Sequence, residues 1–212
     1  MSMRSFPDIP SNKIIPILKI PEPEYLVERA QHAKLPSQIK DFLEHTAIGT
    51  PSEAITKDLG VGFARMSQLA KQTLGATHLS HAVRILLDAE LIKAPIEEKE
   101  YDDLGNNPQP LINLALYSLG LHVGQIANLA AILPYGRSRL EGSNKKLNTG
   151  TITNALGVAR RRLKSPTTAS AINAAHKIGI LSLAKNRELI DPCIAFNSVT
   201  LKGQSILALK QV

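Results

Sequence analysis

Leu74–Ile92 reads LGATHLSHAVRILLDAELI, and Leu163–Leu181 reads LKSPTTASAINAAHKIGIL. Laid over each other without a gap, both stretches start at a leucine and pass through a short polar turn. Both then continue as a helix rich in alanine and β-branched residues and end in a Leu/Ile exit. Two further helix-like segments precede each stretch. A repeat of this size indicates that one helical unit is used twice.

Further sequence blocks recur around the repeat in the same order. In the first copy they lie at Leu35–Gln38, Gly49–Gly60 and Thr73–Ile92, and in the second at Gly120–Ala127 and Thr151–Leu181. In order and spacing these blocks resemble the DNA-binding domain of LuxR-type transcriptional regulators, a four-helix variant of the helix-turn-helix. Measured against that pattern, the first copy is about three residues short in its recognition helix. The resemblance covers roughly 130 of the 212 residues.

The sequence therefore predicts a mainly all-α fold with two tandem tetrahelical helix-turn-helix units. Aromatic residues make up 4% of the chain and Trp is absent, which suits close-packed short helices better than a sheet. The expected parts are a Pro-rich, extended N-terminal extension (1–33, with a short helix near Glu22–His32), a first unit (34–93), a linker (94–109), a second unit (110–182) with a basic insertion (134–148), and a short mixed C-terminal docking tail (183–212). Helices are expected near 36–46, 51–58, 62–73, 78–89, 110–119, 123–132, 149–163 and 166–178.

Hydropathy and cysteine content indicate a cytoplasmic protein. No run of the chain approaches 18 apolar residues, so neither a membrane span nor a secretory signal is expected. The single cysteine, Cys193, cannot form an internal disulfide, which is consistent with a reducing compartment. We interpret it as a small buried apolar residue.

Charge separates the two halves of the chain. Residues 1–100 contain 12 Lys and Arg against 13 Asp and Glu, whereas residues 101–212 contain 13 against 5. This asymmetry points to a polyanionic partner for the second half, and phosphate neutralisation dominates non-specific DNA affinity. The alternative is a basic solvated surface that only aids solubility.

The segment 149–163 is the candidate recognition helix. Its apolar residues recur with helical spacing, and Asn148 or Thr149 can cap its start. In a helix-turn-helix the first turns of this helix reach base edges in the major groove. Asn pairs with adenine, Thr packs its methyl on thymine, and later cations meet phosphates. We therefore expect base contacts from Thr151, Thr153, Asn154 and Gly157, phosphate contacts from Arg160, Arg161, Arg162 and Lys164, and a DNA contact of either kind from Thr149.

One of these expectations has a plainer alternative, and another has a physical reason. The three consecutive arginines also suit a helix C-terminus, where the helix dipole favours cations. Gly157 is unfavourable in a helix interior by about 1 kcal/mol relative to Ala, which suggests close approach of another surface.

Weaker DNA contacts are expected elsewhere. The helix near 62–73 offers Arg65, Ser67, Gln68 and Lys71, but acidic residues balance the cations around it, so a structural or dimerising role is as plausible. The insertion carries Arg137, Arg139, Lys145 and Lys146 among glycines. Such a loop can follow a phosphate backbone or enter a minor groove, or it is simply solvated.

The last helix of each copy has a predicted start and partner. Ser165 followed by Pro166 suits an N-cap with proline at the first helical position, and Thr77 repeats this device in the first copy. In LuxR-type domains the last helix commonly forms the dimer contact. The helices 78–89 and 166–178 could therefore meet within one chain as a pseudo-dimer, or each could pair with its counterpart in another chain.

Features of an enzyme are scarce. His78 and His81 have a metal-ligand spacing, but no Cys or acidic partner completes a site, so a surface pair is the better interpretation. There is no phosphate-binding loop and no nucleophile motif. We expect a non-enzyme with no catalytic residues, no cofactor and no metal.

The leading hypothesis is a bacterial, sequence-specific DNA-binding transcriptional regulator. It would bind duplex DNA as a homodimer on half-sites about one helical turn, or a multiple of it, apart. Two alternatives stay open. One is a protein-interaction adaptor or antiactivator that reuses the fold; separately, the C-terminal tail could bind a protein partner. The other is a plasmid- or element-borne accessory DNA-binding protein acting in partition, replication or transfer.

Overall fold

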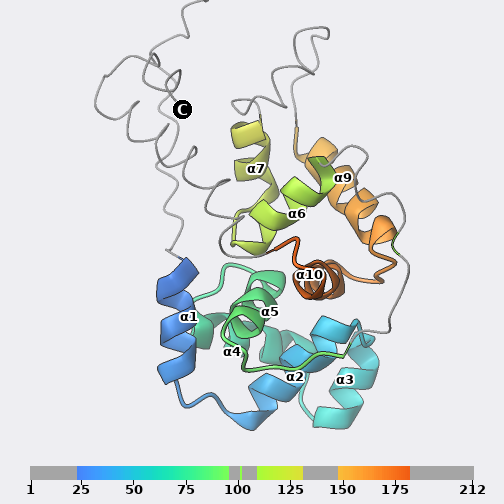
Figure 1. The fold of residues 1–212 in the computed structure, drawn as a ribbon. Coiled ribbons are helices and arrows are strands. Elements are labelled where there is room, and N and C mark those ends of the chain that lie inside the picture. The colour runs from blue at the N-terminus through green and yellow to red at the C-terminus, as the bar shows by residue number, and fades with distance from the viewer. Residues whose placement is uncertain (1–22, 96–100, 102–108, 131–147, 182–212) are drawn as a thin grey trace, which may run out of the picture.

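The computed structural model describes residues 23–95, 101, 109–130 and 148–181. Within these residues all regular secondary structure is α-helical (Figure 1), so the expected mainly α-helical fold is confirmed. None of the helices in these ranges is long and apolar enough to cross a membrane. The extended N-terminus, the four cations of the insertion, Cys193 and the docking tail lie outside the described residues.

The helices begin and end close to the predicted positions. α1 (Pro23–His32) corresponds to the short helix expected in the N-terminal extension. The first unit contains α2 (Ser37–Ile48), α3 (Ser52–Leu59), α4 (Phe63–Leu74) and α5 (Leu79–Asp88). The second unit contains α6 (Gln109–Ser118), α7 (Val123–Ala130), α9 (Thr149–Arg162) and α10 (Thr168–Lys177). α5 and α10 occupy identical positions in the gapless overlay of the two repeats.

The two units also share one packing scheme. In the first, α2 contacts α3, α4 and α5, and α4 contacts α3 and α5. In the second, α6 contacts α7, α9 and α10, and α9 contacts α7 and α10. Buried apolar side chains of both units form a single cluster. The internal repeat seen in the sequence is therefore a repeat of contacts as well, built around one continuous core.

The starts of the two last helices differ from the prediction. The N-cap of α5 is His78, whose Nδ1 accepts the backbone N–H of His81, and not Thr77. The N-cap of α10 is Thr167, not Ser165, so Pro166 precedes the cap instead of opening the helix. Thr167 and Ser170 form a reciprocal capping box, which satisfies two backbone donors at once. That gain outweighs the preference of proline for the first helical position.

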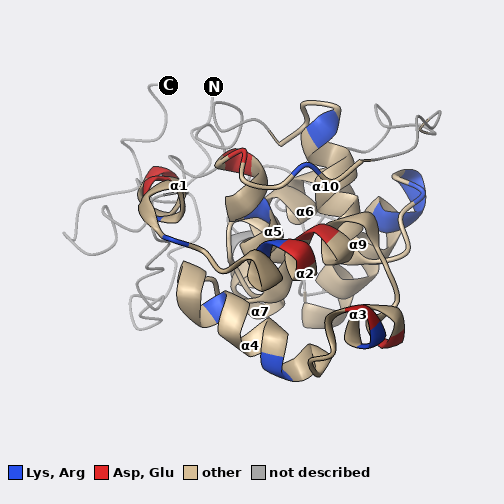
Figure 2. Ribbon diagram, turned by 90° about the horizontal axis from the view of Figure 1, so that it is seen from below, with Lys and Arg blue, Asp and Glu red and all other residues tan. Residues whose placement is uncertain are grey.

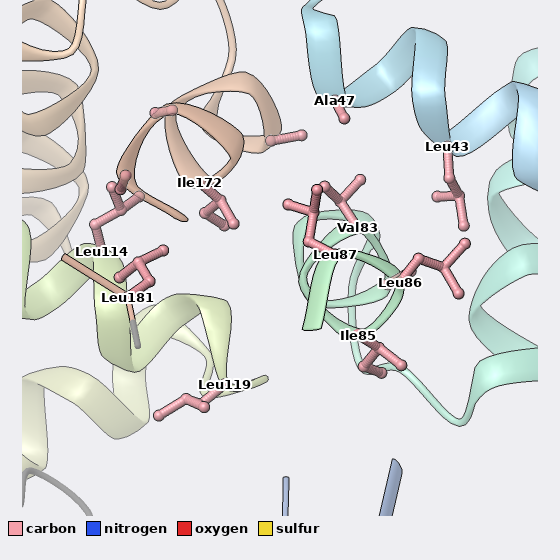
Figure 3. Packing of buried hydrophobic residues seen from close by; sticks show 14 of the residues in the cluster. Leu43, Ala47, Val83, Ile85, Leu86, Leu87, Leu114, Leu119, Ile172 and Leu181 are labelled. Atoms are coloured by element: carbon pink, nitrogen blue, oxygen red, sulfur yellow. The ribbon is translucent and has the colours of Figure 1, made fainter. Parts of the chain in front are cut away.

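α5 and α10 pack against each other within the chain. Figure 3 shows Ile172 of α10 turned toward Val83 and Leu87 of α5. All three side chains are buried. Of the two arrangements left open by the sequence, the structure contains the intramolecular one. We call the interface in which α5 and α10 pack against each other, α10 packs against α2, and α5 packs against α6, the seam.

The seam is reciprocal at its glycines. Gly49, at the end of α2, has φ +86°, and a Cβ placed there would lie 2.6 Å from Cγ of Pro166. Gly120, at the end of α6, has φ +94°, and its Cβ would lie 2.5 Å from Nδ1 of His81. Thr77 Oγ1 also donates to the carbonyl oxygen of Gly120 at 2.7 Å. Each unit thus presses a glycine onto the start of the other unit's last helix, and any side chain at these positions would collide.

The buried polar groups of the seam repeat the same exchange. Arg84 of α5 donates to Asp88, to Ser118 at the end of α6, and to the carbonyl oxygen of Leu181 after α10. Asn173 of α10, at the equivalent position in the overlay, donates to the carbonyl oxygens of Ala47 at the end of α2 (3.1 Å) and Ala94 after α5 (3.4 Å). The two units therefore make equivalent contacts in both directions.

Candidate nucleic-acid interface

One face of α9 packs against the protein core. Ile152, Leu156, Ala159 and Leu163 are buried and lie on the stripe predicted to face the core, while the helix contacts α6, α7 and α10. Its start is fixed by Asn148, whose Oδ1 accepts the Thr151 backbone N–H at 2.9 Å. The predicted helix and its cap are confirmed. These contacts and the cap set the orientation of α9 on the core, so the face opposite the buried stripe points away from the protein.

The opposite face of α9 is exposed. The side chains of Thr153, Asn154 and Arg161 are open to solvent, as are Thr149 before them and Lys164 after them. No described part of the chain covers Asn154 or Arg161, which is the condition that a groove-reading helix must meet. The Asn154 amide carries one acceptor and two donors, and is thus able to pair with a base edge in two hydrogen bonds.

The hydroxyls of Thr151 and Thr153 form hydrogen bonds within α9 and its cap. Thr153 Oγ1 donates to the carbonyl oxygen of Thr149 at 2.9 Å, and Thr151 Oγ1 lies 3.2 Å from the capping oxygen of Asn148. Thr153 consequently offers its methyl group outward. This is the group expected to pack on a thymine methyl.

The three consecutive arginines have different surroundings. Arg160 is half-buried and donates to the carbonyl oxygen of Pro166 in the turn before α10. It therefore braces this turn, as the helix-terminus interpretation implies. Arg162 is also half-buried, and only Arg161 of the three is exposed. Of the four cations expected to contact phosphates, the exposed ones are therefore Arg161 and Lys164.

Gly157 has no internal packing reason to be glycine. A Cβ built there would come no nearer than 3.9 Å to any neighbour, namely the Arg161 side chain. Gly150 differs, because its Cβ would lie 3.2 Å from the capping oxygen of Asn148. The cap thus accounts for Gly150, whereas close approach of a partner remains our prediction for Gly157.

α4 presents a smaller polar face. Arg65 and Gln68 are exposed, whereas Ser67 and Lys71 are half-buried. Met66, Ala70 and Leu74 are buried against the core. Counted back from the shared leucine that ends the repeat, α4 begins three residues later than α9, which agrees with the shorter recognition helix expected in the first copy.

Acidic residues lie in the first unit and in α1 (Figure 2). Residues 109–130 and 148–181 contain no Asp or Glu, while their cations are Arg160, Arg161, Arg162, Lys164 and Lys177. In the first unit, residues 34–93, acidic and basic residues nearly balance, so the attraction for an anionic partner would be greatest at the C-terminal end of α9.

The interpretation of His78 and His81 as a surface pair is wrong. His81 is 3% exposed, and His78 stacks on Tyr117 of α6 with ring centroids 3.9 Å apart. Burial, with smaller effects of His122 and Lys71, lowers the pKa of His78 to about 4. Burial, aided by His78 and Arg84 and opposed by Asp88, lowers the pKa of His81 to about 3. Both rings are neutral at pH 7 and belong to the seam.

The described residues contain no cluster of His, Cys, Asp or Glu able to hold a metal ion. Comparisons of the chain with protein-family models, with curated proteins and with solved structures found no match.

Proposed function

We propose that the protein binds duplex DNA in a sequence-dependent manner and regulates transcription, with α7 and α9 acting as a helix-turn-helix and α9 entering the major groove. The observation that carries this proposal is the exposed face of α9. Asn154 is exposed in the second turn of a helix that packs on the core, with Arg161 about two turns beyond it toward the basic end. The resemblance to LuxR-type domains and the basic second half support it.

The division of labour on α9 follows from position. Residues in its first turns approach base edges, and cations near its end approach phosphates. Asn154 and Thr153 are therefore assigned to sequence preference, and Arg161 to general affinity. Arg160 is assigned to holding the turn into α10, because its guanidinium is already engaged there.

The general affinity is tested by measuring fluorescence anisotropy of a labelled duplex between about 50 and 200 mM salt. The logarithm of the binding constant should fall linearly with the logarithm of the salt concentration. Arg161→Ala should reduce the slope by about 1, the contribution of one phosphate contact. Lys34→Ala, which removes an exposed cation between α1 and α2, is the matched control and should leave the slope unchanged.

Sequence preference is tested with duplexes selected from a random pool by the full chain. Asn154→Ala should reduce the preference for the selected duplex over a scrambled one by about 1–3 kcal/mol. Equal losses on both duplexes would refute the base-reading role. Binding that is absent at every salt concentration, together with a co-purifying protein, would instead favour the adaptor or antiactivator function. Promoter and replication-origin roles differ only in where the selected sequence lies in a genome.

A further inference from the structure

We propose that a single chain reads two unlike half-sites on one duplex, with α4 in one major groove and α9 in the next. This inference rests on the proposed function, and deepens it by naming the kind of DNA site. It replaces the expected pairing of two chains by pairing of the two units inside one chain.

The first step is the symmetry of the seam. Gly49 contacts the start of α10, and Gly120 contacts the start of α5. Asn173 bonds to the end of α2, and Arg84 bonds to the end of α6. An operation that carries each unit onto the other and exchanges their contacts in this way is a two-fold rotation.

A two-fold rotation also fixes the relative positions of α4 and α9. Turning by 180° leaves the height of a point along the axis unchanged, so α4 and α9 lie at the same level along the two-fold axis. An exposed face that one helix presents along the axis is presented by the other in the same direction. This is the arrangement by which helix-turn-helix dimers set two recognition helices into successive grooves, about 10 base pairs apart.

α4 and α9 offer different side chains at equivalent positions. Ala70 and Leu74 of α4 correspond to Ala159 and Leu163 of α9, and all four are buried. In this register Arg65 corresponds to Asn154, and both are exposed. Arg pairs with guanine at O6 and N7, whereas Asn pairs with adenine at N6 and N7. The preferred site is therefore a guanine-containing half joined to an adenine-containing half, not a palindrome.

The charges make the two half-sites unequal in strength as well. Among the cations of α4, Arg65 is exposed and Lys71 is half-buried, and the neighbouring α3 exposes two acidic residues, Glu53 and Asp58, against one cation, Lys57. α9 has Arg161 and Lys164 exposed and no acidic residue within the described second unit. We infer that the α9 half-site supplies most of the affinity, and that the α4 half-site mainly adds selectivity.

The experiment uses the full chain and duplexes selected from a random pool. Native mass spectrometry of the complex counts chains per duplex, and hydroxyl-radical footprinting maps the protected backbone. One chain protecting two segments about one helical turn apart is the expected result. Two chains per duplex, or one chain that protects a single groove, would overturn the inference while leaving DNA binding intact. Absence of any binding would instead remove the proposed function, and the inference with it.

A variant then tests the identity of the halves. Arg65→Asn should weaken binding to the selected duplex about tenfold or more, and repeating the selection should give a site whose two halves are more alike. Gln38→Asn, at an exposed position of α2, is the control and should leave the selected site unchanged. An unchanged selected site for Arg65→Asn would show that α4 does not read the duplex.

Discussion

Replacing Gly120 by alanine probes the seam, because the structure leaves no room for a methyl group there. The backbone at Gly120 has φ +94°, and a Cβ would lie 2.5 Å from Nδ1 of His81 and 3.0 Å from Oγ1 of Thr77. His81 is buried and its Nδ1 accepts the Thr77 backbone N–H at 3.2 Å, so the ring cannot move aside easily. A left-handed alanine costs about 1–2 kcal/mol, and overpacking adds about 1–3 kcal/mol. We expect Gly120→Ala to lower the free energy of unfolding by about 2–5 kcal/mol.

Gly60→Ala separates the two contributions. Gly60 has φ +64°, but a Cβ there would meet nothing within 4 Å. It should therefore lose only the backbone contribution, about 1–2 kcal/mol. Urea unfolding followed by far-ultraviolet circular dichroism gives all three free energies. Gly120→Ala should be less stable than Gly60→Ala by more than about 0.5 kcal/mol. A smaller difference would show that the two units do not meet at Gly120 as described.

Three further predictions concern buried or capping groups. Arg84→Ala should destabilise the protein by about 3–5 kcal/mol in urea unfolding, because it leaves the Asp88 carboxylate without its arginine; a loss below about 1 kcal/mol would contradict the buried network. Since His78 and His81 have pKa values below the ordinary 6.5 when folded, stability should be complete above pH 6.5 and fall below it by up to about 1.4 kcal/mol per pH unit per histidine. His81→Asn should flatten this dependence between pH 6.5 and 5, and an unchanged dependence would show that His81 is not responsible. Asn148→Ala should cost about 1 kcal/mol and speed amide exchange in the first turn of α9, with little effect on exchange in α10.

The sequence predicted the helices well because each carries its own local signal. Ile152, Ala155, Leu156, Ala159 and Leu163 recur with helical spacing, and the structure buries all of them except Ala155, which is half-buried. The repeat predicted which helices would correspond, and α5 and α10 indeed begin at matching positions. The face of α9 opposite the buried stripe could also be assigned, since a helix has only one way to bury such a stripe.

The sequence could not predict contacts between residues that lie far apart in the chain. The spacing of three residues between His78 and His81 is compatible with a pair on the helix surface. In the structure the other unit covers them, with Tyr117 stacked on His78. Nothing within a few residues of either histidine reports this cover. The side-chain bonds of Arg84 to residues far along the chain are invisible for the same reason.

The misplaced caps have a different cause. Ser165 followed by Pro166 is a favourable local signal, yet the Thr167–Ser170 pair satisfies more backbone groups. The spacing of three between Thr167 and Ser170 was present in the sequence and could have identified this cap. When two capping signals of similar strength lie close together, a small difference in free energy decides which residue caps the helix.

The most direct test of the account asks whether position 154 lies against base edges in the major groove. A cysteine introduced by Asn154→Cys, in a Cys193→Ser background, is exposed to a selected duplex whose cytosine carries a disulfide-activated tether in the major groove. Rapid cross-linking at position 154, and none for Gln38→Cys on α2, is the result that we predict. Bound DNA that cross-links no faster to Asn154→Cys than to Gln38→Cys would contradict the placement of α9 in the groove.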